Sequence, residues 1–146
     1  MTRREQRTGS RGQEMAAIAL RLLGIEMVEK IATPVKLIRS PYKGLFKVIW
    51  EETVSGDHRG ILRDGTSVLA ETKTVLDGNL TWSHLREHQP GRLTEHAEYN
   101  GISLLVWVHN TGIYILKWPV PDFGPRKSIT PDRASQLQIH SLGDEQ

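Results

Sequence analysis

The chain has 146 residues, of which 38% are hydrophobic and 25% are charged, and it contains no cysteine. This composition is typical of one soluble globular domain, and the missing thiols exclude disulfides and thiolate catalysis. No apolar run approaches the ~20 residues of a membrane-spanning helix, and the N-terminus lacks the apolar stretch of a signal peptide. We therefore expect a cytoplasmic protein, from a cellular or a viral gene, without a membrane partner.

The net charge is only +2, but basic residues crowd the N-terminus. Guanidinium groups suit phosphate oxygens, so residues 1–9 are interpreted as a basic flexible arm that contacts nucleic acid. An ordinary solvated tail explains the same charge run equally well. The charge run spans the first eleven residues and contains Arg3, Arg4, Arg7 and Arg11, the last of which lies just beyond the arm.

The first expected element is a helix over residues 11–23. Ser10 and Gln13 have the spacing of a capping box, and Gly24 supplies a C-terminal stop. Apolar residues recur between them at helical spacing. These residues are Met15, Ile18, Ala19, Leu22 and Leu23.

The remaining elements predict an α/β domain that ends near residue 118. A second helix is expected from about Gln89 to residue 100, after a short turn at 83–87, because Pro90 suits only the start of a helix. Residues 119–146 are interpreted as a tail with a short helix at 130–137. Strands are expected at 25–31, at two pieces within 35–51, and at 55–62, 66–73, 102–109 and 112–118. This order predicts a central mixed β-sheet flanked by helices.

The two pieces within 35–51 carry a second group of basic residues. They fit a protruding basic hairpin and a plain extension of the sheet equally well. The basic residues are Lys36, Arg39, Lys43 and Lys47.

The hairpin 55–73 carries the candidate chemistry. A three-residue loop at 63–65 with a left-handed glycine would pair residue 61 with 67, 59 with 69 and 57 with 71. Asp57 and Glu71 would then lie opposite each other with Cβ atoms ~5 Å apart, and Lys73 would follow on the same face. A two-residue turn would instead point Asp57 away from Glu71.

Two carboxylates at this spacing favour a hard divalent cation, Mg²⁺ or Mn²⁺, and the Thr72 carbonyl offers a further ligand. Such an ion lowers the pKa of a bound water and neutralises charge on an attacked phosphate, while Lys73 orients the water or stabilises the transition state. The pattern therefore predicts a hydrolytic phosphodiesterase centre. A surface ion pair between Asp57 and Lys73 remains the structural alternative.

Several segments in this order resemble the PD-(D/E)XK nuclease superfamily, and within it the Holliday-junction-resolving endonucleases of the RecU and archaeal types. The resemblance implies a fold like that of restriction endonucleases, Mg²⁺-dependent paired nicking of four-way DNA junctions, and a homodimer. It covers roughly residues 10–118. The segments that carry it are SRGQEMA (10–16), ATPV (32–35), SGDHRG (55–60), LAETKT (69–74), HLREHQPGRL (84–93) and NGISLLVWV (100–108).

The resemblance also implies roles for individual residues. Asp57 and Glu71 match the metal-binding acids and Lys73 matches the catalytic lysine. Glu14 matches a further acid near the metal, although an acid that meets the helix dipole explains it equally well. Gln89 matches a glutamine that supports the site.

The same comparison assigns DNA contacts. Ser55 stands where these enzymes place a hydroxyl two residues before the acid, and residues 35–47 match a basic stalk that projects between DNA arms. Arg59 is a further expected DNA contact.

Three rival interpretations remain. His84, Glu87 and His88 match the zinc-peptidase pattern H-x-x-E-H, although Pro90 argues against one long helix there. A less structure-selective restriction-like or repair endonuclease would carry the same acids and lysine. A non-catalytic DNA-binding protein on the same scaffold is the third.

Overall fold

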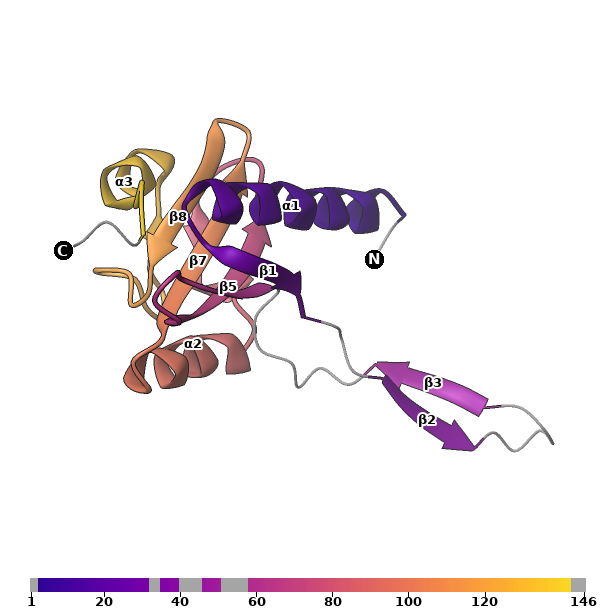
Figure 1. The fold of residues 1–146 in the computed structure, drawn as a ribbon. Helices are drawn as coiled ribbons and strands as arrows, with labels where there is room; N and C mark the ends of the chain where they lie inside the picture. Colours follow the sequence, from indigo (N-terminus) through magenta and orange to yellow (C-terminus); the bar gives the residue numbers. More distant parts are fainter. Residues whose placement is uncertain (1–2, 32–34, 40–45, 51–57, 143–146) are drawn as a thin grey trace.

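A five-stranded β-sheet forms the centre of the structure, a computed structural model that describes residues 3–31, 35–39, 46–50 and 58–142 (Figure 1). The strand order is β1-β4-β5-β7-β8, in which β5 and β7 run parallel and the other neighbours run antiparallel. The expected mixed sheet is therefore confirmed. The strands are β1 (Glu26–Lys30), β4 (His58–Ile61), β5 (Ser67–Thr74), β7 (Ile102–His109) and β8 (Gly112–Lys117).

Helices cover both faces of this sheet. Helix α1 (Arg3–Leu22) lies on one face and α2 (His88–Glu98) on the other, while α3 (Pro131–Leu137) lies beside β8 (Figure 1). None of these helices, over the described ranges, is long and apolar enough to cross a membrane.

The core consists of two apolar layers, one on each face of the sheet. Strands β5 and β7 contribute alternate side chains to both layers, as expected for a parallel pair buried on both sides. The α1 layer contains Ala16, Leu20, Leu23, Val68, Ala70, Leu104 and Val106. The α2 layer contains Leu69, Leu85, Leu93, Leu105, Trp107, Leu116 and Trp118.

Helix α1 differs from its prediction in two respects. It begins at Arg3 rather than near residue 11, so the backbone of most of the expected flexible arm is helical. The arginine, glutamate and glutamine residues before Ser10 are good helix formers and extend the helix past that capping motif. The packed face also differs in part. Leu23 is buried as expected, but Ala16 and Leu20 face the sheet while Ile18 and Leu22 stay exposed.

Strands β2 (Val35–Arg39) and β3 (Phe46–Trp50) form a separate two-stranded antiparallel sheet. Val35 pairs with Trp50 and Arg39 pairs with Phe46, so the basic stretch is a hairpin and not an extension of the central sheet. Figure 1 shows this hairpin away from the central sheet.

The chain after residue 118 contributes to the core. Val120, Ile129 and Ala134 are buried in the α2 layer, and the short strand β9 (Ser128–Ile129) pairs with β6 (Leu80–Thr81). The sequence interpretation missed this two-stranded sheet because two-residue strands carry no periodic signal. The expected short helix is confirmed as α3, with the Thr130 hydroxyl accepting a hydrogen bond from the Arg133 N–H.

Candidate active site

The β4–β5 hairpin turns over three residues, as the sequence predicts. Gly65 has φ +89, the Leu62 N–H donates to the Thr66 carbonyl at 2.9 Å, and the Thr66 N–H donates to Asp64 Oδ1 at 2.9 Å. Hydrogen bonds from Thr66 also hold the pKa of Asp64 below its usual value. The resulting register pairs Ile61 with Ser67 and Arg59 with Leu69. The predicted register is confirmed over the described strand.

Asp57 and Ser55 lie outside the described residues, so their predicted roles stay predictions. Within the described ranges, no three or more His, Cys, Asp and Glu side chains are grouped so as to hold a metal ion. The predicted divalent site therefore depends on Asp57 joining Glu71.

Glu71 lies on the α2 face of β5 and is almost fully buried, with 3% of its surface exposed. Gln89, from the first turn of α2, donates from Nε2 to Glu71 Oε1 at 2.5 Å. Gln89 Oε1 in turn accepts the Arg86 backbone N–H at 2.8 Å, which leaves the amide nitrogen to face the carboxylate. The structure thus holds the Gln89 side chain at both ends and brings it to Glu71.

Lys73 follows on the same face of β5, with Nζ 3.9 Å from Glu71 Oε1 and only 16% of its side chain exposed. This is not a surface ion pair, since water is largely excluded from both partners. Thr72, between them, is also buried. The end of β5 therefore places a carboxylate, an ammonium group and a glutamine amide together.

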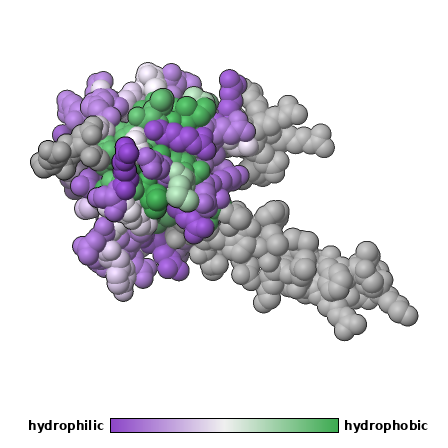
Figure 2. All heavy atoms as spheres, viewed as in Figure 1, coloured by the Kyte–Doolittle hydropathy of each residue, from purple (hydrophilic) through white to green (hydrophobic). Residues whose placement is uncertain are grey.

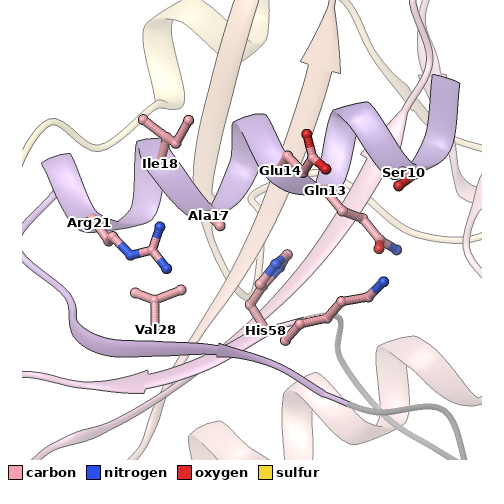
Figure 3. A pocket seen from close by; sticks show the side chains of 9 residues that line it. Ser10, Gln13, Glu14, Ala17, Ile18, Arg21, Val28 and His58 are labelled. Atoms are coloured by element: carbon pink, nitrogen blue, oxygen red, sulfur yellow. The ribbon is translucent and has the colours of Figure 1, made fainter. Parts of the chain in front are cut away.

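Glu14 lies on the opposite face of the sheet from Glu71. It lines a groove of about 400 Å³ between α1, β1 and β4, together with Gln13, Arg21 and His58 (Figure 3). Glu14 is exposed at the surface of α1, whereas His58 is buried. The suggested approach of Glu14 to the metal stays a prediction, and its neighbours in this structure are those of the groove.

The predicted DNA contacts divide into those that the structure describes and those that it does not. Arg11 is exposed on α1, and Arg59 is exposed on β4, where NH2 lies 3.5 Å from Glu29 Oε2. Lys36, Arg39 and Lys47 lie on the ladder of the separate hairpin, and Lys43 lies outside the described residues.

The zinc interpretation requires His84 and His88 on one helix. In the structure, His84 is the last residue of a short 3-10 helix, η1 (Trp82–His84). The next residue, Leu85, is extended, and α2 begins at His88. His84 Nδ1 accepts the Thr81 N–H at 2.9 Å. The break before Pro90 therefore separates the two histidines, as the proline suggested.

A polar cluster that no sequence pattern predicted lies at the other end of α2. His96 contacts the hydroxyl of Ser67 through Nε2 and that of Ser103 through Nδ1, each at 2.9 Å. The Ser103 hydroxyl donates to the Leu93 carbonyl, so it accepts from the Nδ1–H of His96, and Nε2 accepts from Ser67. Burial lowers the pKa of His96. The cluster joins α2 to the beginnings of β5 and β7.

No protein-family model and no curated protein matches this sequence. Among solved structures, the Holliday junction resolvase Hjc of the archaeal hyperthermophile Archaeoglobus fulgidus aligns with a TM-score of 0.60, over 90% of this chain and 96% of the resolvase. The chain shares the fold of this resolvase. The two sequences are 12% identical, so the likeness is one of fold.

Proposed function

We propose that this protein is a Mg²⁺-dependent DNA endonuclease that resolves four-way junctions by paired symmetric nicks. The observation that supports this most directly is the cluster at the end of β5, where buried Glu71 meets Gln89 and Lys73. A resolvase fold that extends over nearly the whole chain is the second support.

The donor chemistry of this cluster fits a hard divalent cation. Glu71 offers a carboxylate oxygen, the Thr72 carbonyl offers a main-chain oxygen, and Asp57 is proposed as the second acid. Mn²⁺ can substitute for Mg²⁺ because both prefer oxygen ligands. When bound, such an ion lowers the pKa of a coordinated water and neutralises charge on the attacked phosphate.

The side chains around the Glu71 carboxylate are proposed to stabilise the transition state and to orient the metal ligand. Lys73 brings a fixed positive charge into a poorly hydrated site, where it stabilises negative charge that develops on the phosphate or orients the attacking water. Gln89 keeps Glu71 in one orientation, because its own amide is fixed by the Arg86 N–H. Arg11, Arg59 and the basic hairpin 35–47 are proposed to bind the DNA backbone.

The test compares a labelled four-way junction with linear duplex of the same sequence, in Mg²⁺ and in EDTA. We expect paired nicks near the branch point in Mg²⁺ and none in EDTA. Lys73→Ala and Asp57→Asn should bind the junction but lose cutting by roughly 10²–10³-fold, as for removal of one group that stabilises transition-state charge. Lys117→Ala, at an exposed lysine of β8, is the matched control and should cut normally.

Three results would contradict the proposal at different levels. Equal cutting of duplex and junction would replace the resolvase by a less selective endonuclease. Normal cutting by Lys73→Ala, with thermal unfolding unchanged, would show that catalysis does not take place at the proposed site. Junction binding with no cutting by the unmodified protein in any divalent ion would leave a DNA-binding protein.

A further inference from the structure

A pocket of about 440 Å³ lies beside the two-stranded sheet of β6 and β9. Its walls come from the end of β6 and the start of η1 on one side, and from residues 125–128 on the other. The Trp82 N–H donates to the Lys127 carbonyl at 3.0 Å, which continues the strand pairing and fixes the two walls against each other. The volume is in the range of pockets that hold a small molecule or one group of a larger ligand.

Trp82 supplies an aromatic wall to this pocket. Its ring stacks on Trp118 with the centroids 5.9 Å apart and meets Phe123 edge-on at 5.2 Å, yet it stays only half-buried. The indole N–H groups of Trp107 and Trp118 donate within the fold, whereas that of Trp82 has no hydrogen-bond partner among the described residues. Figure 2 shows that the surface over α2, the helix that follows η1, is more hydrophilic than the surface over α1 and β1. A fixed, half-open tryptophan beside such a surface suits a planar polar ligand rather than an apolar partner.

Arg126 brings a positive charge to the same pocket. The Lys127 N–H donates to the Gly124 carbonyl at 3.0 Å, which closes a tight turn with Pro125 second and Arg126 third. Arg126 has φ +66, the pattern of a type II turn, whose third position favours glycine. Lys127 pairs with Asp122, whereas exposed Arg126 forms no ion pair with any residue that the structure describes. An arginine at a position that favours glycine, with its charge turned to solvent, points to a ligand.

We propose that this pocket binds an unpaired nucleotide of a DNA strand, with the base stacked on Trp82 and the phosphate bound by Arg126. Aromatic side chains hold single-stranded bases because every base has a π-face, and a guanidinium group matches phosphate oxygens. Duplex DNA fits poorly, since its bases are stacked on one another and enter a pocket only when they leave the stack. The inference rests on the proposed function only in taking DNA as the nucleic acid.

The pocket is joined to the candidate active site by a short segment of chain. The Trp82 carbonyl accepts the Leu85 N–H at 3.0 Å, and the next N–H, that of Arg86, binds the side chain of Gln89. Gln89 in turn donates to Glu71. A nucleotide on Trp82 is therefore held by the same segment that orients the Glu71 carboxylate, and the pocket should favour DNA with unpaired nucleotides.

The first test separates base stacking from charge. The full chain is titrated with a short, fluorescently labelled oligothymidine strand in EDTA, so that nothing is cut, and binding is followed by anisotropy. An abasic strand of the same length presents the backbone without the bases. Trp82→Leu should weaken oligothymidine binding by roughly 5–150-fold and leave abasic binding unchanged. Trp82→Phe keeps an aromatic face and should retain most of the affinity.

The second test removes the charge without straining the fold. Arg126→Gly gives the turn the residue that its third position favours, so the variant should unfold at the same temperature or higher. It should weaken binding of both the oligothymidine and the abasic strand. The slope of log Kd against log salt concentration should also fall by about 0.7, as for the loss of one phosphate contact. Arg63→Gln, at an exposed arginine of the β4–β5 turn, is the matched control and should bind normally.

Unchanged oligothymidine binding by Trp82→Leu and Arg126→Gly would overturn the inference. An equal loss in Arg63→Gln would do the same, because binding would then depend on net charge alone. Equal competition by a duplex of the same length would exclude an unpaired base as the ligand, and equal competition by free thymidine monophosphate would exclude a strand. All of these measurements are made without cutting, so a failed pocket and a failed nuclease are distinguished.

Discussion

At Gly12, helix α1 lies close against β5, the strand that carries the candidate site. A Cβ added there would lie 2.0 Å from Thr74 Oγ1, 3.2 Å from its Cβ and 3.4 Å from its Cγ2. Gly12→Ala gains about 1 kcal/mol in helix propensity, while the overpacking costs typically 1–3 kcal/mol. We therefore expect a net loss of up to about 2 kcal/mol in the free energy of unfolding.

A double-mutant cycle separates the two terms. Thr74→Ala removes the hydroxyl and the methyl group and leaves only the 3.2 Å contact between Cβ atoms, which a shift of a few tenths of an ångström relieves. On that background Gly12→Ala should become neutral or stabilising, with a coupling of about 1–3 kcal/mol. Urea unfolding of the four proteins gives the required free energies.

The same cycle reports on the site, because Thr74 directly follows Lys73. A displaced end of β5 would move Lys73 away from the phosphate that it is proposed to stabilise, so Gly12→Ala should slow junction cutting and the double variant should recover it. Additive effects on stability, or a stabilising Gly12→Ala in the unmodified chain, would refute the close packing of α1 on β5.

Three further predictions follow from other contacts. Gln89→Leu removes the hydrogen bond to Glu71 and should lower cutting about 10–100-fold in a Mg²⁺ titration, whereas exposed Gln136→Leu should not. Burial lowers the pKa of His96 in the folded chain, so the imidazole binds a proton more readily in the unfolded chain. The free energy of unfolding should therefore fall as pH drops below 6.5. His96→Asn should flatten that slope in unfolding titrations, and equal slopes would contradict the burial of the ring. Leu104→Ala, at a side chain with 0% exposure, should cost about 2–5 kcal/mol in denaturant unfolding, and a smaller loss would mean that the α1 layer collapses around it.

The parts of the fold that sequence predicted correctly are those governed by short-range rules. The hairpin register follows from the turn itself, since Gly65 accepts a positive φ and Asp64 binds the Thr66 N–H two residues on. The start of α2 is similarly local, because Pro90 is tolerated only where no helical N–H is needed. The helix was expected to start near Gln89, and α2 begins one residue earlier, at His88.

The errors arose where tertiary contacts decide between local alternatives. On α1 the sequence offers two apolar lines, and only the sheet determines that Ala16 and Leu20 are buried while Ile18 is exposed. The tail after residue 118 is polar on average, yet Val120 and Ile129 fill the α2 layer. Neither the buried side of α1 nor the burial of the residues after 118 can be read from the sequence of a single helix or strand.

The candidate site combines both kinds of information. The spacing of Glu71 and Lys73 on one strand is local, but Gln89 stands 18 residues from Glu71 and reaches it only because α2 packs on that face. Burying this group is costly, and an apolar pair of similar volume would serve stability as well or better. Its neighbours on the same face, Leu69 and Trp107, are buried apolar residues, so apolar side chains can pack at this place in the fold. Because this buried carboxylate, held by an amide and an ammonium group, adds little to stability, we propose that it acts on a substrate.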